Sequence, residues 1–465
     1  MSTNINWETV HFERDIYSHL LKWAESSGQG LFLRGPRQVG KTSILQKLGK
    51  EKCFSGTLYI DLRNPEIKEW FDKVNGLSTW RERFIKFARE TNAHAPIDTN
   101  GKFLVILDEI QESPRMFNSI RDIVREKTLK LAVTGSYLGI TEFENRYSEQ
   151  GQSYFMPVGD VEVFMMGSLS YKEAVKAAKT IIPELSKKEI FQRYFNYGGY
   201  PEVVKKWCQS KEWSIIKIPL DNIYKMLEAE ARRYILEPLT QQTWDRMFIS
   251  VAQQIIKKGD ILQSAEFSEE ITYKLRVSSI EGTHREAKIN MMSWMLSCDL
   301  LWFGEVTHNL SNLADINKKN YFVSDQGLLY LALSNSLILS SMPLSKGDIS
   351  GALAENFVAL GIREYRLPLS YAKKSSEEID FLLKETEDVK PDAIEVKFTN
   401  GETASSDNAL KAGLIRRIIK IQRETDESTE KVIIFPMMDM DDFGSLYGWD
   451  YKHNRYTRPE LNLFE

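Results

Sequence analysis

An eight-residue segment near the N-terminus, GPRQVGKT, carries the glycines, lysine and hydroxyl that a phosphate-binding loop needs. It fits the pattern GxxxxGK[ST] and lies between an apolar run, LFLR, and a stretch with helical spacing. Glycines let successive backbone N–H groups point at a phosphate, and the helix N-terminus adds its positive dipole end. We expect Lys41 on the β and γ phosphates and Thr42 on Mg²⁺. The predicted loop residues are Gly35, Pro36, Arg37, Gln38, Val39, Gly40, Lys41, Thr42 and Ser43.

An acidic pair ends a second apolar run, FLVILDEIQ. Asp108 is predicted to hold the Mg²⁺, directly or indirectly, and Glu109 to polarise the attacking water. The alternative is a helix cap, which also uses acidic residues after a strand. The next apolar run ends in LAVTGS, which places Thr134 and Ser136 at the carboxyl edge of a sheet. Their hydroxyls could sense the γ-phosphate or the water, or could be ordinary turn residues.

A third set of chemical groups lies on the segment EIDFLLKETEDVKPDAIEVKF, residues 378–398. Read as a hairpin, it places Asp380, Glu395 and Lys397 on one face and apolar residues on the other. Two carboxylates can hold a Mg²⁺ with open positions, and a lysine can orient water. Glu355, on a preceding helical stretch, is a candidate third metal ligand. The alternative is a solvated hairpin face, on which glutamate and lysine are common.

The elements around these groups predict an α/β fold. Short apolar runs at 30–35, 56–62, 102–110 and 130–136 alternate with helical spacing at 78–91 and 115–127. This alternation is typical of a parallel sheet covered by helices. We predict a P-loop NTPase core at 1–166 and a helical lid at 167–240. A winged-helix-like domain is predicted at 241–340 and a nuclease-like α/β domain at 341–465.

The middle and C-terminal parts carry further predictions. Residues 283–296 are the expected recognition helix, with His284, Arg285 and Lys288 near its start. Residues 408–425 are predicted to be a helix and 430–437 a strand. Lysines and arginines in VKKW, QQIIKKGD, DINKKN and IRRIIKIQR could form a basic face, or could be solvated surface charges.

The composition limits the partners and the compartment. The chain has 465 residues, 42% of them hydrophobic, and a formal net charge of -4, so any nucleic-acid binding must come from a local basic face. The three cysteines are far apart and form no CxxC pair, which favours a reducing cytoplasm. No signal peptide is expected at the N-terminus. No membrane span is expected, since the most apolar run, 325–344, is interrupted by Ser334, Asn335 and Ser336.

The order of GPRQVGKTSIL, VILDEIQ, VTGSYL and YFNYGGYPEVV resembles that of prokaryotic AAA-type P-loop ATPases with a C-terminal domain of unknown function. The resemblance implies ATP hydrolysis with Mg²⁺, and ATP in preference to GTP. The Asp380 and ExK arrangement resembles the restriction-endonuclease-like core, although the usual proline before the first acid is replaced by Ile379. Arginine-finger candidates, in cis or from a neighbouring subunit, are Arg121, Arg125, Arg146, Arg232 and Arg233.

Together these patterns predict a Mg²⁺-dependent ATPase whose cycle controls a nucleic-acid-facing C-terminal half, with DNA or RNA as the candidate nucleic acid. In that reading Glu109, Lys41 and Lys397 are the catalytic residues. The alternative is a slow nucleotide-dependent switch that docks a protein partner and has a degenerate nuclease-like domain. The sequence leaves open the oligomeric state and the nucleic acid recognised.

Overall fold

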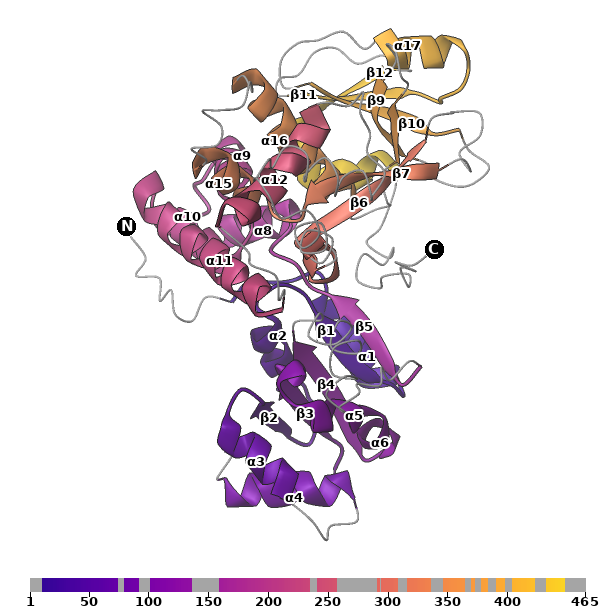
Figure 1. Cartoon of the computed structure of the whole chain (residues 1–465). Helices are drawn as coiled ribbons and strands as arrows, with labels where there is room; N and C mark the ends of the chain where they lie inside the picture. The colour runs from indigo at the N-terminus through magenta and orange to yellow at the C-terminus, as the bar shows by residue number, and fades with distance from the viewer. Residues whose placement is uncertain are drawn as a thin grey trace, which may run out of the picture. The chain divides into compact units, whose positions relative to one another are not determined.

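The structure is a computed structural model of the chain (Figure 1). It describes residues 11–73, 79–91, 101–135, 159–234, 241–256, 291–292, 294–307, 316–335, 346–363, 369–372, 378–383, 390–397, 404–422 and 432–447. The chain divides into two compact units. We call residues 13–167 the N-terminal unit and the described residues from 168 onward the C-terminal unit.

A five-stranded sheet with the order β2-β3-β4-β1-β5 forms the centre of the N-terminal unit. Its strands are β1 (Gly30–Arg34), β2 (Thr57–Asp61), β3 (Phe103–Asp108), β4 (Leu129–Gly135) and β5 (Val161–Met165). All neighbouring strands pair in parallel. The four predicted strands are confirmed, and β5 adds a fifth that the sequence analysis did not identify. Parallel pairing brings the carboxyl ends of β1, β3 and β4, which carry the predicted phosphate-site residues, to one edge of the sheet.

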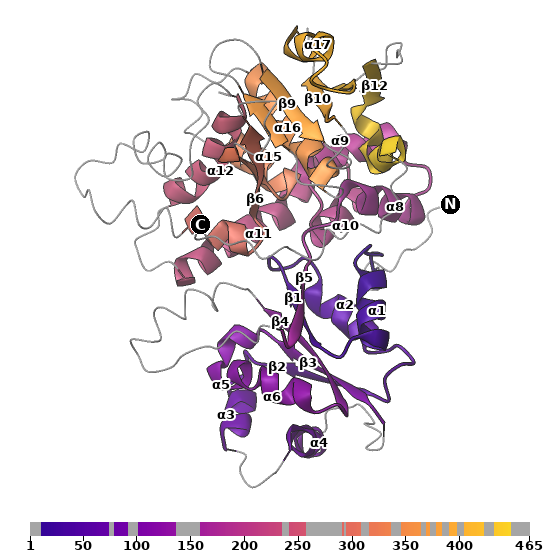
Figure 2. The ribbon, with the colours of Figure 1, turned by 90° about the vertical axis from the view of Figure 1, so that its right-hand side faces the viewer.

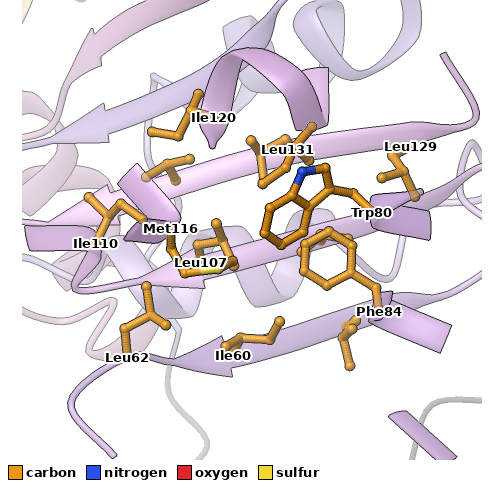
Figure 3. Close-up of a cluster of buried hydrophobic side chains, with 14 of the residues drawn as sticks. Ile60, Leu62, Trp80, Phe84, Leu107, Ile110, Met116, Ile120, Leu129 and Leu131 are labelled. Carbon is orange, nitrogen blue, oxygen red and sulfur yellow. The ribbon is translucent and has the colours of Figure 1, made fainter. Parts of the chain in front are cut away.

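One face of this sheet is covered by α3 (Pro65–Lys73), α4 (Trp80–Glu90), α5 (Pro114–Asn118) and α6 (Ile120–Arg125). Figure 3 shows the rings of Trp80 and Phe84 over the middle of this face, with Ile60 on one side and Leu131 on the other. Both aromatic residues belong to one buried cluster with the strands. Burial of each such side chain contributes about 1.5–3 kcal/mol, so this face stabilises the sheet that positions the site.

The opposite face carries α1 (Tyr17–Ser26) and α2 (Lys41–Leu48), as Figure 2 shows. Helix α2 begins directly after the glycine loop and buries Ile44, Leu45 and Leu48. Helix α4 begins with a capping box, in which Thr79 and Glu82 each bond the other's backbone N–H. Such a box satisfies two N–H groups that otherwise lack intrahelical partners, and it places the start of the helix.

Helices form the first part of the C-terminal unit, as predicted for residues 167–240. They are α8 (Tyr171–Ile181), α9 (Lys187–Tyr197), α10 (Pro201–Gln209) and α11 (Trp213–Tyr234), followed by α12 (Gln241–Ile256). Both α8 and α9 begin with a Ser-x-x-Glu capping box. Further along the chain are α15 (Gln326–Asn335) and α16 (Lys346–Arg363).

The GGYP segment joins distant parts of this unit. The buried Asp325 accepts hydrogen bonds from the backbone N–H groups of Gly199 (2.9 Å), Gly327 (2.9 Å) and Leu328 (3.1 Å). A Cβ on Gly198 would lie 2.3 Å from the Asp325 carboxylate, and the φ of Gly198 is +75°. Glycine at position 198 is therefore required both by the close approach and by the left-handed backbone.

A seven-stranded sheet with the order β12-β11-β10-β9-β8-β6-β7 completes the C-terminal unit. Its strands are β6 (Leu301–Thr307), β7 (Ile316–Val323), β8 (Leu369–Ala372), β9 (Glu378–Leu383), β10 (Asp392–Lys397), β11 (Ile418–Gln422) and β12 (Val432–Pro436). Helix α17 (Ala404–Lys411) lies between β10 and β11 in sequence, and the 3-10 helix η3 (Met437–Tyr447) follows β12. The predicted hairpin is confirmed, because β9 and β10 pair antiparallel.

The predicted helix at 408–425 is wrong in its second half. Helix α17 ends at Lys411, Gly413 takes a φ of +68°, and Ile418–Gln422 is strand β11 between β10 and β12. Glycine in the left-handed region is a common helix terminator. The isoleucines that follow are β-branched and are buried in the sheet, which favours the strand over the helical reading.

Strands β6 and β7, within the range predicted as a winged-helix-like domain, form an antiparallel ribbon with Leu301 opposite Val323. Its strand β6 also pairs in parallel with β8, so the ribbon belongs to the same sheet as the hairpin. This sheet crosses the predicted boundary at residue 340, and the winged-helix-like domain stays a prediction. The predicted recognition-helix residues His284, Arg285 and Lys288 lie outside the described residues.

No helix among the described residues is long and apolar enough to span a membrane.

Candidate phosphate-binding site and hairpin acids

The glycine loop has the backbone that a phosphate cradle requires. Gly35 has a φ of +140° and Gly40 a φ of +97°, both outside the range that other residues adopt readily. A Cβ on Gly35 would lie 2.0 Å from the carbonyl oxygen of Met166. Met166 in turn donates its N–H to the carbonyl of Arg34 at 2.8 Å. The loop is therefore packed tightly against the end of β5, and only glycine fits at position 35.

Two cations are held by carbonyls of this loop and its surroundings. Lys41 Nζ donates to the carbonyl oxygens of Gly35 (2.8 Å) and Pro36 (2.7 Å). Arg14, which the sequence analysis missed, donates to the carbonyls of Val39 (2.9 Å) and Gly167 (2.8 Å). Arg14 precedes α1 and carries no motif, so no sequence signal marked it. Its two hydrogen bonds tie the loop to the end of the N-terminal unit.

Asp108 and Thr42 meet at the predicted metal position. Thr42 Oγ1 donates to Asp108 Oδ2 at 2.7 Å, and Tyr59 Oη donates to the same oxygen at 2.7 Å. Burial raises the pKa of Tyr59 above its ordinary value, and the hydrogen bond to Asp108 raises it further. Tyr59 therefore stays protonated and remains a donor. It lies on β2, next to β3, and the sequence analysis did not identify it.

Glu109 is the residue after the end of β3, with a φ of +54°. Its Oε2 accepts a hydrogen bond of 2.5 Å from Gln111 Nε2 and lies 3.7 Å from Arg37 of the loop. The Glu109 side chain is 15% exposed. The predicted acidic pair is thus split, because Asp108 engages Thr42 while Glu109 turns toward Gln111.

Thr134 lies at the end of β4 and is 0% exposed. Its Oγ1 has no hydrogen-bond partner among the described residues. The register aligns Leu107 with Val133, so Thr134 is the next neighbour of Asp108 across β3 and β4. The hydroxyl therefore lies on the face that also carries α2, as a phosphate-sensing or water-sensing residue must. Ser136 lies outside the described residues.

The candidate arginine fingers have different surroundings. Arg121 pairs with Asp160 at 2.8 Å, and Arg232 pairs with Glu228 at 2.6 Å. Arg125 is exposed on α6. Arg146 and the side chain of Arg233 lie outside what the structure describes. An arginine finger in cis or in trans stays a prediction.

The residues present fit a nucleotide with Mg²⁺. The loop leaves no room for a Cβ at Gly35, and its lysine already binds carbonyl oxygens at hydrogen-bond distance. Thr42 and Asp108 bring a hydroxyl and a carboxylate together, the two oxygen types that this metal site uses. Lys41, Thr42 and Asp108 are thus the residues that would hold the phosphates and the metal.

The hairpin acids are neighbours across β9 and β10. The register aligns Phe381 with Ile394, so Asp380 is opposite Glu395 in the next pair. Asp380 is 7% exposed and Glu395 2%. Leu382 and Ala393, close to them on the same strands, belong to a buried cluster with residues of α17 and β11. The alternative of a solvated hairpin face is therefore wrong, because these carboxylates are buried.

Three polar groups surround the Glu395 carboxylate. Ser406 of α17 donates to its Oε1, and Lys397 Nζ lies 3.1 Å from its Oε2. Asp380 accepts a hydrogen bond of 2.6 Å from the backbone N–H of Val396. Burial raises the pKa of Glu395, and the negative charge of Asp380 raises it further. The pair combines two acids that repel each other with one nearby cation.

Glu355 lies on α16 and is not gathered with these acids into a metal site. Among the described residues, no group of three or more His, Cys, Asp or Glu side chains could hold a metal ion. Of the residues predicted for the hairpin site, the structure brings together Asp380, Glu395 and Lys397. In the register of β10 and β11, Lys420 is the neighbour of Glu395 and Gln422 the neighbour of Lys397. The sequence analysis placed Lys420 and Gln422 in a helix.

Two arginines of the predicted basic face have an internal role. Arg416 binds Asp392 through Nε and Nη2, each at 2.8 Å, and Arg417 Nε binds the same carboxylate at 3.0 Å. Asp392 is fully buried. Such bonds are needed to compensate a buried charge. These arginines therefore stabilise the start of β10. A basic face formed by IRRIIKIQR would have to use the other cations of that segment.

Comparisons with known proteins support the N-terminal assignment. Residues 27–175 match the model of a protein family described as an AAA domain. This part of the chain is therefore similar to an AAA domain. The match begins before β1 and ends within α8, so it includes the whole five-stranded sheet.

Solved structures also match the chain at low identity. A Walker-type ATPase of Pyrococcus abyssi is 14% identical over 70% of this chain and 96% of that chain, with a TM-score of 0.43. The ORC1 protein of Aeropyrum pernix, solved in complex with DNA, is 12% identical over 71% of this chain and 94% of that chain, with a TM-score of 0.28. No curated protein sequence matches the chain.

Proposed function

We propose that the chain is a Mg²⁺-dependent ATPase whose cycle controls a nucleic-acid-facing C-terminal half. The observation that carries the hydrolytic part is the contact between Thr42 and Asp108 beside the glycine loop, with Glu109 at the end of the same strand. In support of the proposal, these side chains lie at one edge of a parallel sheet, where nucleotide phosphates commonly bind.

The chain's own residues divide the reaction between them. Lys41 and the loop N–H groups would bind the β and γ phosphates, and Tyr59 and Thr42 would orient Asp108. Glu109 would take the proton from the attacking water as it adds to the γ-phosphorus, and the bond to the β-phosphate oxygen would break. Mg²⁺, when bound, would neutralise charge that develops on the phosphate oxygens.

The test is the steady-state rate of phosphate release from ATP with Mg²⁺, with and without single- and double-stranded DNA or RNA. Glu109→Gln is the blank. Turnover above the blank supports hydrolysis, and stimulation by nucleic acid that falls with added salt supports a nucleic-acid-facing half. Turnover that no nucleic acid changes favours the alternative, a slow switch that docks a protein partner. A wild-type rate no higher than that of Glu109→Gln would contradict the proposal that the chain hydrolyses ATP.

We also propose metal-dependent phosphodiester hydrolysis at the hairpin, because two buried carboxylates lie beside Lys397. Asp380 and Glu395 would hold the metal, and Lys397 would orient water or offset developing charge. The order of α16, three strands, α17 and β11 supports the resemblance to a nuclease core. Nicking of plasmid DNA with Mg²⁺ or Mn²⁺ by the wild type, but not by Lys397→Ala, is the expected result. Equal nicking by both proteins would assign it to a contaminant.

A further inference from the structure

Gln111 follows Glu109 by two residues, in the short 3-10 turn η1 (Ile110–Glu112). Its amide Nε2 donates a hydrogen bond of 2.5 Å back to Oε2 of Glu109. Gln111 is 6% exposed, so its amide is held away from bulk water. Burying an amide costs free energy unless hydrogen bonds compensate it. The contact with Glu109 is its only hydrogen bond among the described residues.

We infer that Gln111 is a positioning residue for ATP hydrolysis, which holds the Glu109 carboxylate by Oε2 and leaves Oε1 to accept the proton of the attacking water. The inference rests on the proposed ATPase function. Both recorded side-chain contacts of Glu109, from Gln111 and from Arg37, are made to Oε2. The geometry thus distinguishes the two carboxylate oxygens.

Position matters because a general base must lie within hydrogen-bond reach of the water. Glu109 leaves β3 with a left-handed backbone and carries a partly exposed side chain, so the strand alone does not hold its carboxylate. A misplacement of about 1 Å can reduce a reaction rate roughly 100-fold. A donor fixed in the turn directly after Glu109 limits that movement.

Gly135, at the end of β4, makes room for this amide. A Cβ on Gly135 would lie 2.2 Å from Gln111 Oε1, whereas the nearest backbone atom, the nitrogen of Ile110, would be 3.3 Å away. The φ of Gly135 is not in the left-handed region, so alanine can adopt this backbone. Alanine at 135 would therefore displace the Gln111 amide with little effect on the surrounding backbone. The structure thus offers a way to move Gln111 without changing it.

A packing role for Gln111 makes a different prediction from a positioning role. Gln111→Met keeps the length and most of the volume of the side chain but cannot donate a hydrogen bond. Gln111→Glu keeps the shape and places a second carboxylate beside Oε2 of Glu109. Repulsion between the two carboxylates would move the acid limb of the kcat–pH profile to higher pH. A side chain that only fills space would produce neither a loss in the first variant nor a shift in the second.

The experiment measures kcat and KM for ATP, with Mg²⁺, in the full-length wild type, Gln111→Met, Gln111→Glu, Gly135→Ala and the Gln111→Met/Gly135→Ala double variant. The exposed Gln46 of α2 supplies the control, Gln46→Met. We expect a roughly 10- to 100-fold lower kcat in Gln111→Met and Gly135→Ala, with KM within about twofold of the wild type. The double variant should be no slower than the worse single variant, because both changes remove one interaction.

Thermal melting of each variant separates a loss of positioning from a loss of folding. A Gln111→Met protein that melts like the wild type and keeps its kcat within about twofold would overturn the inference. Additive losses in the double variant would also overturn it, since they would assign Gly135 a separate role. If the wild type does not exceed the Glu109→Gln blank, the ATPase proposal and this inference both fail. If the wild type exceeds the blank and the Gln111 variants turn over ATP as fast as the wild type, only this inference fails.

Discussion

The phosphate loop and the hairpin each combine a lysine with two acids, yet they hold these charges differently. Lys41 binds carbonyl oxygens of its own loop, and Asp108 accepts hydrogen bonds from two hydroxyls. At the hairpin, Lys397 pairs directly with Glu395, and the second acid lies on the neighbouring strand. At the loop, neutral dipoles surround the position expected for a phosphate. At the hairpin, the buried side chains carry a net negative charge when both acids are ionised. The proposed phosphate site and the hairpin thus differ in how their acidic side chains are compensated.

The largest effect is expected for Lys41→Ala, which should lower ATP turnover at least about 100-fold, since charge on the transferred phosphate loses its cation. Phosphate release under saturating ATP measures it. Lys22→Ala, exposed on α1, is the control. Normal turnover in Lys41→Ala would show that the loop does not act on ATP, and the comparison with Lys397 would lose its basis.

Gly35→Ala should be the next largest, because a Cβ would lie 2.0 Å from the Met166 carbonyl oxygen. The left-handed φ adds strain of about 1–3 kcal/mol. We expect weaker binding of a fluorescent ATP analogue and a lower melting temperature. Gly28→Ala is the matched control, because a Cβ there meets nothing within 4 Å. Equal melting temperatures for the two variants would mean that the loop yields without strain.

Glu395→Gln should stabilise the protein at neutral pH, whereas Gly35→Ala in the loop should destabilise it. Because burial raises its pKa above 4.5, Glu395 in the folded protein keeps its proton at pH values where the unfolded chain has lost it. Its contribution to the free energy of unfolding therefore falls as pH rises above about 4.5 and levels off beyond the folded-state pKa. We expect the variant to melt a few degrees higher at pH 7 and at nearly the same temperature as the wild type at pH 4.

Melting curves at several pH values test this expectation. Asp392→Asn serves as the contrast, because two arginines already bind that buried acid and its loss should destabilise the protein. A lower melting temperature of Glu395→Gln at pH 7 would show that Lys397 and Ser406 compensate the buried charge, and would make the hairpin a structural site.

Tyr59→Phe should have the smallest effect. It removes one of the two hydroxyl donors on Asp108 Oδ2 and leaves Thr42 in place. One hydrogen bond to a charged group contributes about 1.5–3 kcal/mol, but water can replace part of it at a partly exposed site. We expect turnover to fall roughly 2- to 10-fold. Unchanged kcat and KM would limit Tyr59 to packing beside β3.

Much of the N-terminal unit could be predicted from local patterns. Glycines, a lysine and a threonine at fixed spacing predicted the loop, and the apolar run before Asp108 predicted β3. Strand β5 was missed, although Val161–Met165 is as long as β1 and follows a turn at Gly159 and Asp160. Its role comes from pairing with β1, which no local pattern of its own sequence reports.

The C-terminal unit was predicted less well, for a physical reason. Residues 418–422 have apolar spacing that fits a helix as well as a strand, and the pairing of β11 with β10 and β12 decides between them. The face of the hairpin that carries Asp380 and Glu395 could be read from strand alternation. Its burial could not, because Ser406 and the residues of α17 arrive from a later part of the chain.

The sequence by itself determined the phosphate loop, the acidic pair after β3 and the order of acids on the hairpin, because these depend on spacing along a single helix, strand or turn. Only the tertiary structure decided that Tyr59 and Thr42 share Asp108, that Gln111 reaches back to Glu109 above Gly135, and that the hairpin acids are buried. The contacts of Asp108 and the burial of the hairpin acids depend on strand register or on packing between segments distant in the chain. The Gln111 contact is local, but the room for its amide depends on Gly135 of β4. Local periodicity reports none of these.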